Sequence, residues 1–258
     1  RLGILILPRH LHHFYEAAEA AGGELPVAVV IGVDPMTLLA SQAIVPIDHD
    51  ELEVASALHG TPLPVTRCLS NEVRVPALAE IVIEGRLLPK VREREGPFGE
   101  FPQYYGPAGE REVLAIDVVS HRHDAVFHTI VPAAMEHLLL GGIAREASIL
   151  TQLRRTFPGV VDVHLPRGGT CRYHLVVKLR KRWEGEPVNV IMGALAAHAD
   201  IKHVVVVDED VDIYDSVSVE WAVATRFQAA RDTVIVSGGQ GSKLDPSADD
   251  GLSDKMGL

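Results

Sequence analysis

Around residue 135 the sequence changes from one repeating pattern to another. The part before it holds many short apolar runs separated by turn residues, such as Leu25–Val33, which predicts the strands of a barrel-like sheet. After it, a long helical stretch, Glu136–Phe157, is followed by alternating strands and helices. Such alternation predicts an α/β layer whose sheet is at least partly parallel. We therefore predict a mixed α/β (α+β) chain of two domains, residues 1–132 and residues 133–258.

Several segments of the chain are predicted from their local pattern. The β-branched and aromatic run Ala125–Val131 predicts a further strand. Gly238–Lys243 has the glycines of a phosphate-binding loop without its Gly-Lys-Ser/Thr order, and it is predicted to be a loop, as is Asp245–Asp254. The acidic run Asp208–Asp212 lacks the glycine and the final glutamate of a calcium loop, so we interpret it as structural.

The composition excludes several classes of protein. The net charge is −11, which argues against non-specific binding to nucleic acid or to anionic membranes. The only cysteines, Cys68 and Cys171, are too few for a disulfide framework in 258 residues and are typical of a reducing, cytoplasmic location. The apolar runs are too short to cross a bilayer, so no membrane span is predicted.

Two carboxylates five residues apart, Glu95 and Glu100, enclose a stretch of Gly, Pro, Phe and Gly. A strand would place them on opposite faces and a helix on well-separated faces, so only a turn can bring them together. Gly96-Pro97 and Gly99 supply that turn chemistry. The two acids would then converge beside Phe98 and the tyrosine pair that follows, an arrangement able to keep one acid neutral and the other ionised. Spacing alone leaves a solvated surface loop as the alternative.

Three histidines stand at the start of a helix predicted for Arg9–Ala21. Histidine can bind metal, but a helix points His10 and His12 apart by roughly 200°, so at most a subset of these two and His13 can share one site. Glu51 lies near the N-terminus of another predicted helix, where the helix dipole favours a carboxylate. From the residues alone, a structural role is therefore open for each of these side chains.

A series of short motifs in a fixed order indicates a protein family more specifically than any single residue or spacing does. They are Arg9-His10, Leu25-Pro26-Val27-Ala28, Gly32-Val33-Asp34-Pro35, Ser70-Asn71-Glu72, Val75-Pro76-Ala77, Glu80–Gly85, Glu95–Glu100 with Tyr104-Tyr105-Gly106, Val207–Val211, Trp221-Ala222, Thr225-Arg226, Arg231-Asp232 and Lys255-Met256-Gly257. This set resembles the UbiD family of decarboxylases, which use prenylated FMN, and it covers essentially the whole chain. The resemblance implies a split β-barrel flavin-binding domain followed by a C-terminal α/β oligomerisation domain.

The resemblance also implies roles for particular residues. Glu100 matches the acid that donates a proton beside the cofactor, and Glu95 matches the acid that forms an ionic network with an arginine. His10 and Glu51 match cofactor-binding residues that ligate a divalent metal, usually manganese, bridged to the cofactor phosphate. Lys255 matches a lysine that supports the same phosphate, and potassium is a further cation implied for this site. His12 and His13 keep a structural interpretation.

The implied reaction is the non-oxidative, reversible decarboxylation of an aromatic or α,β-unsaturated carboxylic acid. Decarboxylation leaves electrons on carbon that side chains accept poorly, so a cofactor is needed as electron sink. Glu100 must be protonated when it delivers its proton, whereas the pKa of a free glutamate is about 4.3. Burial or a second negative charge must therefore raise the pKa of Glu100. The implied partners are the small carboxylic acid, a UbiX-like flavin prenyltransferase that supplies the cofactor, and further copies of the chain in a dimer or hexamer.

The chain also departs from the family pattern. An asparagine metal ligand and the network arginine are expected just upstream of Arg1, and a tail is expected after Leu258. We therefore expect an interior fragment whose active site is incomplete. An alternative function is a non-catalytic cofactor-holding or assembly subunit, completed by a partner chain that supplies those residues. A third is a flavin-dependent oxidoreductase with a related split barrel, which NADH would reveal by bleaching the flavin.

Overall fold

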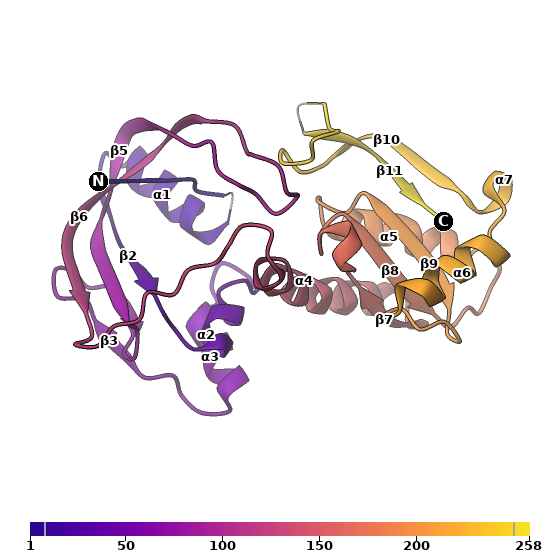
Figure 1. Cartoon of the computed structure of the whole chain (residues 1–258), viewed down its shortest axis with the longest axis horizontal. Coiled ribbons are helices and arrows are strands. Elements are labelled where there is room, and N and C mark those ends of the chain that lie inside the picture. Colours follow the sequence, from indigo (N-terminus) through magenta and orange to yellow (C-terminus); the bar gives the residue numbers. More distant parts are fainter. Residues whose placement is uncertain (8, 250) are drawn as a thin grey trace. The chain divides into compact units, whose positions relative to one another are not determined.

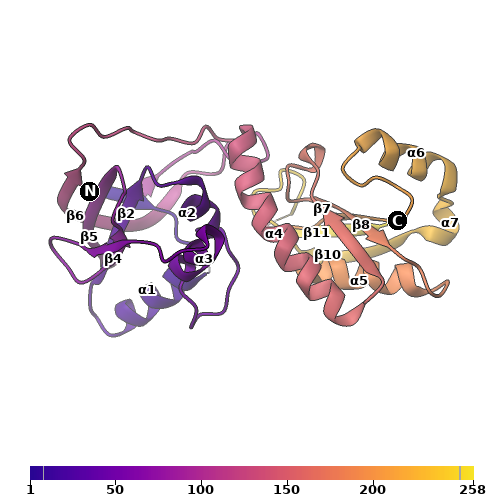
Figure 2. The same cartoon turned by 90° about the horizontal axis from the view of Figure 1, so that it is seen from below.

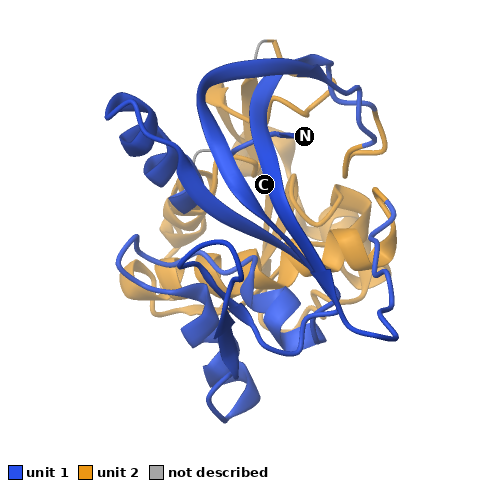
Figure 3. Ribbon diagram, turned by 90° about the vertical axis from the view of Figure 1, so that its left-hand side faces the viewer, with its two compact units in different colours: residues 1–99, 105–131 blue, residues 100–104, 132–258 orange. Residues whose placement is uncertain are grey.

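A computed structural model describes residues 1–7, 9–249 and 251–258, which form two compact units (Figures 1 and 3). The first unit contains residues 1–99 and 105–131, and the second contains residues 100–104 and 132–258. The elements of the first unit are β1 (Leu2–Ile4), α1 (His10–Ala20), β2 (Leu25–Ile31), α2 (Pro35–Ala40), α3 (Glu51–His59), β3 (Val65–Arg67), β4 (Arg74–Pro76), β5 (Ile81–Glu95) and β6 (Gly109–His121). Those of the second are α4 (Met135–Thr156), β7 (Val160–His164), the 3-10 turn η1 (Arg167–Gly169), β8 (His174–Leu179), α5 (Glu186–Ala197), β9 (His203–Asp208), α6 (Ser216–Arg226), α7 (Ala229–Asp232), β10 (Val234–Gln240) and β11 (Leu252–Gly257). The mixed α/β class predicted from the sequence is confirmed.

The first unit is built on a four-stranded antiparallel sheet in the order β1-β6-β5-β2. Its longest pair, β5 and β6, bends at a bulge beside Gly85, where a Cβ atom would lie 2.1 Å from the carbonyl oxygen of Ala115. Glycine is needed there because the partner backbone leaves no room for a side chain. Among the described residues β1 and β2 form the two edges, so closure into the predicted barrel is not shown.

Helix α1 packs on this sheet through Tyr15, which is 3% exposed and joins a small core with Ile6, Leu87 and Leu114. The hydroxyl of Tyr15 donates to the carbonyl of Leu88 in β5 at 3.0 Å. This contact fixes the helix whose first residue is His10.

The second unit is a helix-sheet-helix sandwich around a five-stranded sheet in the order β10-β11-β9-β8-β7 (Figure 2). Helices α4 and α5 cover one face over a core that includes Leu175 and Val177, and α6 covers the other over Val205 and Val207. Strands β8 and β11 each pair with β9 in parallel, which confirms the predicted partly parallel sheet. No helix among the described residues is long and apolar enough to span a bilayer.

Three local predictions differ from the structure. Ala125–Val131 forms no strand, although its composition favours one, because β6 already pairs with β1 and β5 and the segment crosses the surface with Val126 and Phe127 exposed. The two predicted loops are only partly right, since β10 extends to Gln240 and β11 begins at Leu252, whereas residues 241–243 and 245–248 form turns and irregular backbone. Asp250, within the second loop, lies outside the described residues. Glycine and charged residues conceal these strands from a pattern based on apolar alternation.

Candidate active site

The predicted turn between Glu95 and Glu100 is confirmed. Glu95 is the last residue of β5 and pairs with Gly109 across the hairpin. Gly96 has φ +84°, a conformation that favours glycine, and the Gly96–Pro97 peptide bond is cis. Gly99 then pairs with Tyr105 in an isolated bridge, which closes the tip of the loop.

The side chain of Glu95 lies against the backbone of β1. A Cβ atom on Gly3 would be 2.0 Å from Cγ and 2.3 Å from Cδ and Oε1 of Glu95, so this position must be glycine for the carboxylate to keep its place. Sequence reasoning missed this contact, although a glycine inside a strand signals a close approach of another group.

Glu100 sits in a tight turn of its own at the tip of the loop. Its amide donates to the carbonyl of Tyr104 at 2.9 Å, and the amide of Gln103 donates to the carbonyl of Glu100 at 3.0 Å. Glu100 is partly buried, and this burial raises the pKa of its carboxyl group above the ordinary value. The environment is therefore one that favours the protonated form.

The aromatic residue that anchors this turn is Phe101, not the predicted Phe98. Phe101 is 6% exposed and belongs to the main core of the second unit, whereas Phe98 is 48% exposed. Glu95 belongs to the first unit and Glu100 to the second. The convergence of their two carboxyl groups therefore stays a prediction.

His10 and Glu51 come together from the first residues of two helices, α1 and α3. Nδ1 of His10 lies 2.9 Å from Oε1 of Glu51, and Nε2 lies 3.0 Å from the carbonyl oxygen of Val45. With the Nε2 proton donated to that carbonyl, Nδ1 turns its lone pair toward the carboxylate. Two lone pairs at this separation repel unless a positive charge, either a proton or a metal cation, lies between them.

The pair fits a divalent cation by its chemistry. An imidazole nitrogen and a carboxylate oxygen are ligands that manganese and magnesium accept, and both side chains are partly accessible, at 23% and 37%. Among the described residues no group of three or more His, Cys, Asp or Glu side chains is placed to hold a metal. His10 and Glu51 would therefore supply two ligands, and water, phosphate or other groups would complete the coordination.

The neighbouring candidates do not join this pair. Nδ1 of His12 lies 3.3 Å from Oε2 of Glu16 on the same helix, and His13 makes an edge contact with the ring of Phe14. The cap of α3 is Asp50, whose carboxylate accepts from the amide of Leu52. Because Asp50 caps the helix, the carboxylate of Glu51 remains available to His10.

Lys255 lies on β11 in the second unit and is 6% exposed. Its ammonium group donates to the carbonyl of Ala199 at 2.8 Å, and Gly239 on β10 leaves room for its methylene groups. Burial lowers the pKa of Lys255. A role at a phosphate remains a prediction for this residue.

Three carboxylates of the acidic run Asp208–Asp212 pair with arginines. Arg226 binds Asp208 at 3.2 Å and Asp210 at 2.7 Å, and Arg180 binds Glu209 at 2.6 Å. These partners support the structural interpretation of the run.

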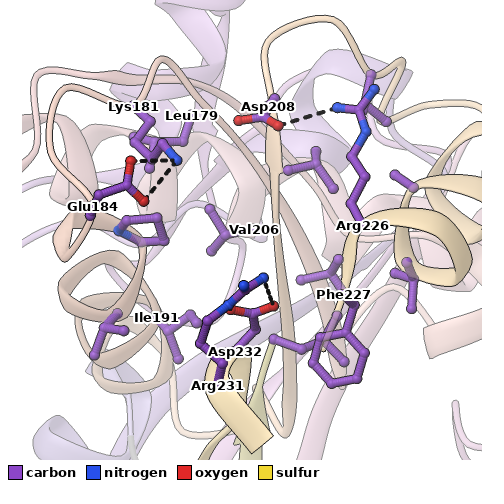
Figure 4. Close-up of a pocket in the computed structure, with 18 residues that line it drawn as sticks. Leu179, Lys181, Glu184, Ile191, Val206, Asp208, Arg226, Phe227, Arg231 and Asp232 are labelled. Atoms are coloured by element: carbon purple, nitrogen blue, oxygen red, sulfur yellow. Dashed lines mark hydrogen bonds and ion pairs between the residues drawn. The ribbon is translucent and has the colours of Figure 1, made fainter. Parts of the chain in front are cut away.

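Beside this run the second unit has a cavity of about 530 Å³ between α5, α6, α7 and the end of β9 (Figure 4). Its labelled charged side chains form three ion pairs, Lys181–Glu184, Asp208–Arg226 and Arg231–Asp232. Because opposite charges are matched, the cavity wall offers no surplus charge to select a ligand.

Comparison with known proteins decides the family. The family model of the 3-octaprenyl-4-hydroxybenzoate carboxy-lyase Rift-related domain (UbiD) matches residues 1–135, and that of the C-terminal domain of the same enzymes matches residues 138–258. The chain belongs to the UbiD family.

The relatives of this UbiD-family chain include named decarboxylases. The anhydromevalonate phosphate decarboxylase of Methanothermobacter thermautotrophicus is 45% identical over 259 residues, which are 100% of this chain and 61% of that protein. The 3,4-dihydroxybenzoic acid decarboxylase AroY of Klebsiella pneumoniae is 33% identical, with a TM-score of 0.90 over 99% of this chain and 57% of that one. The chain thus spans about three fifths of the length of such relatives.

Structures of the UbiD-class enzyme HmfF from Pelotomaculum thermopropionicum are also similar. Its complex with FMN is 57% identical, with a TM-score of 0.97 over 100% of this chain and 58% of that one. An evolved dimeric form of HmfF in complex with prenylated FMN is 53% identical, with a TM-score of 0.91 over 100% of this chain and 57% of that one.

Proposed function

We propose that the protein to which this chain belongs is a prenylated-FMN-dependent decarboxylase that acts, reversibly, on an aromatic or α,β-unsaturated carboxylic acid. The single observation that carries the proposal is the approach of His10 Nδ1 to Glu51 Oε1 at 2.9 Å in a chain of the UbiD family. Relatives named as decarboxylases and the flavin complexes of HmfF support it.

Glu100 is proposed as the proton donor. The cofactor supplies the electron sink that lets carbon dioxide leave, and the carbon that loses carbon dioxide must then gain a proton. Burial of Glu100 favours its neutral form, which is the form that can donate. Glu95 is proposed to stay ionised in a network with an arginine from outside the described residues, and Gly3 leaves the space that its carboxylate needs.

The phosphate end of the cofactor is proposed to bind His10, Glu51 and Lys255. His10 and Glu51 would ligate Mn²⁺, which offsets the phosphate charge, with K⁺ as a further cation, and Lys255 would support the phosphate. In domain terms, we assign cofactor binding to residues 1–132 and oligomerisation to residues 133–258.

The partners of the reaction are proposed in the same way. A UbiX-like prenyltransferase would supply the cofactor, and the protein would work in the cytoplasm as a dimer or hexamer. Two similar chains support this proposal: one belongs to an evolved dimeric form of HmfF, and the other to the vanillic acid decarboxylase VdcCD of Sedimentibacter hydroxybenzoicus, which is 31% identical with a TM-score of 0.86.

The test is to produce the full-length protein together with a flavin prenyltransferase, load it with Mn²⁺, and measure carbon dioxide release from a panel of unsaturated and aromatic acids. We expect turnover of at least one acid, and loss of that turnover in Glu100→Gln, which keeps the shape but cannot donate the same proton. Glu110→Gln, a carboxylate on β6 away from the loop tip, is the matched control and should keep full activity.

Two outcomes would count against the proposal. If the loaded protein binds prenylated FMN but turns over none of the acids, and gains activity only when a partner chain with an Asn- and Arg-bearing strand is added, the alternative of a cofactor-holding subunit is correct. If NADH bleaches the flavin, the protein is an oxidoreductase.

A further inference from the structure

In the turn that carries Glu100, both Phe101 and Pro102 are buried, and Phe101 joins the core of the second unit. The ring of Phe101 lies 5.3 Å from the ring of Tyr173, and the guanidinium carbon of Arg172 lies 4.8 Å from the centre of the Phe101 ring. Phe101 is 6% exposed and packs in the same core as Leu138. The residue next to the proposed proton donor is therefore a core residue of the second unit.

Arg172 is an unusual neighbour for a core residue because its charge is buried. Arg172 is only 6% exposed, and its Nη1 donates to the carbonyls of Leu138 at 3.4 Å and Cys171 at 3.3 Å. Helix α4 leaves space for it at Gly141, where a Cβ atom would lie 2.1 Å from Nη2. A buried guanidinium that is held by backbone carbonyls has little freedom to move, so the face it presents to Phe101 is fixed.

Local backbone hydrogen bonds close the rest of the Glu100 turn. The two backbone hydrogen bonds between Glu100, Gln103 and Tyr104 close it, while Tyr104 is 60% exposed and Tyr105 is 79% exposed. Residues on both sides, up to Gly99 and from Tyr105, group with the first unit. Among the described residues of the turn, Phe101 supplies the aromatic contact to a buried core.

We propose that Arg172 and Phe101 are positioning residues that fix the proton donor Glu100 to the second unit. Arg172 acts through Phe101: its guanidinium holds the ring against Tyr173, and the ring holds the backbone of the turn. The second unit thereby contributes to proton transfer as well as to assembly. The inference deepens the proposed function, on which the role of Glu100 rests.

The positioning role of Phe101 and Arg172 is tested first by amide hydrogen exchange in the full-length protein without cofactor. Phe101→Ala removes the ring, Phe101→Leu keeps most of the apolar volume if the alanine variant does not fold, and Arg172→Met removes the cation. Trp183→Leu is the matched control, because Trp183 also lies under an arginine, Arg182 at 4.2 Å, in the same unit but is 59% exposed. We expect the amides of Glu100 and Gln103 to exchange about tenfold faster in each Phe101 variant and in Arg172→Met, and unchanged in the control.

Two further measurements test the same proposal: hydrogen exchange in a double variant, and the kinetics of the loaded enzyme. Because Arg172 acts through Phe101, the double variant Phe101→Leu/Arg172→Met should exchange no faster than Phe101→Leu alone. With the loaded enzyme, kcat should fall by about 100-fold in Phe101→Ala while KM changes by less than about threefold, since misplacing a reacting group slows chemistry more than binding.

Three results would overturn the proposal that Phe101 and Arg172 position Glu100. They are unchanged exchange in both Phe101 variants, equally faster exchange in Trp183→Leu, and fully additive effects in the double variant. The exchange arm needs neither substrate nor cofactor. Absence of turnover in the wild-type protein would therefore overturn the proposed function, while the exchange result still decides whether Phe101 and Arg172 position Glu100.

Discussion

The backbone of Gly3 passes so close to Glu95 that a methyl group at Gly3 would lie 2.0 Å from Cγ of that glutamate. The Glu95 side chain can rotate away from such a methyl group, so we expect Gly3→Ala to change the free energy of unfolding by less than about 1 kcal/mol. The carboxylate would nevertheless lose its place, and turnover of the loaded enzyme should fall by about tenfold or more. Urea denaturation and carbon dioxide release measure the two effects. Gly168→Ala, at a position with open space around it, should change neither.

The second prediction concerns the stability of Glu100→Gln. Burial raises the pKa of Glu100, so the folded state binds its proton more tightly than the unfolded state does. The stability that this proton contributes is fully present below the ordinary glutamate pKa and is lost as the pH rises through the raised value. At pH 7 Glu100→Gln should therefore be more stable than the wild type, and at pH 4 the difference should shrink. Thermal unfolding at both pH values tests this, and a variant that is less stable at pH 7 would contradict it.

Metal binding should depend on His10 and Glu51 but not on their neighbours. Removal of either ligand, in His10→Gln or Glu51→Gln, should weaken binding of Mn²⁺ to the full-length protein by about 100-fold or more, since loss of even an outer partner costs 10- to 100-fold. His12→Gln and Glu53→Gln are the controls, because each lies two residues from a proposed ligand and outside the pair. Titration with Mn²⁺, followed by electron paramagnetic resonance, measures the affinity. Equal weakening in the controls would exclude this pair as the site.

The fourth prediction is a pH dependence that comes from Glu19. Its carboxylate accepts from the hydroxyl of Tyr15 at 2.7 Å, from the amide of Lys90 at 2.6 Å and from Arg92 at 3.1 Å, and these partners lower the pKa of Glu19 to about 2. A lowered pKa contributes stability above the unfolded-state value, and this stability is lost as the pH falls from about 4.5 toward about 2. Glu19→Gln should therefore be less stable than the wild type at pH 7, by about 1.5–3 kcal/mol, as is typical for hydrogen bonds to a charged group.

Urea denaturation from pH 7 to pH 2 checks the Glu19 prediction, because the gap between variant and wild type should close as the pH falls. Glu16→Gln on the same helix, whose side chain is 64% exposed, serves as the control and should follow the wild-type curve. A gap that widened at low pH would show that the sign of the shift is wrong.

The parts of the site that the sequence predicted are those set by local chemistry. The turn after Glu95 follows from Gly96-Pro97. The helix that begins at His10 follows from apolar periodicity, and the helix that begins at Glu51 is capped by Asp50. The contact between His10 and Glu51 was available only through the family resemblance, because nothing local links residues 41 positions apart.

The parts that the sequence did not predict depend on contacts between distant segments. The glycine at position 3 signals that some group approaches the strand closely, but it does not identify that group as a carboxylate 92 positions away. Phe98 and Phe101 cannot be distinguished by residue type, and only the core of the second unit shows that Phe101 is the buried one. The strand Leu252–Gly257 was missed for the same reason, since its charged residues gain a role only beside β9 and β10. Packing between segments decides each of these cases, and local propensity does not encode it.

The membership of residues 100–104 in the second unit bears on any attempt to study the two halves as separate polypeptides. A cut near residue 132 would leave Phe101 exposed on a surface hairpin of the N-terminal piece, and an exposed apolar side chain of this size favours self-association. The C-terminal piece would carry a phenylalanine-sized void beside Arg172. Chimaeras between relatives should therefore take residues 100–104 and residues 132–258 from the same parent protein.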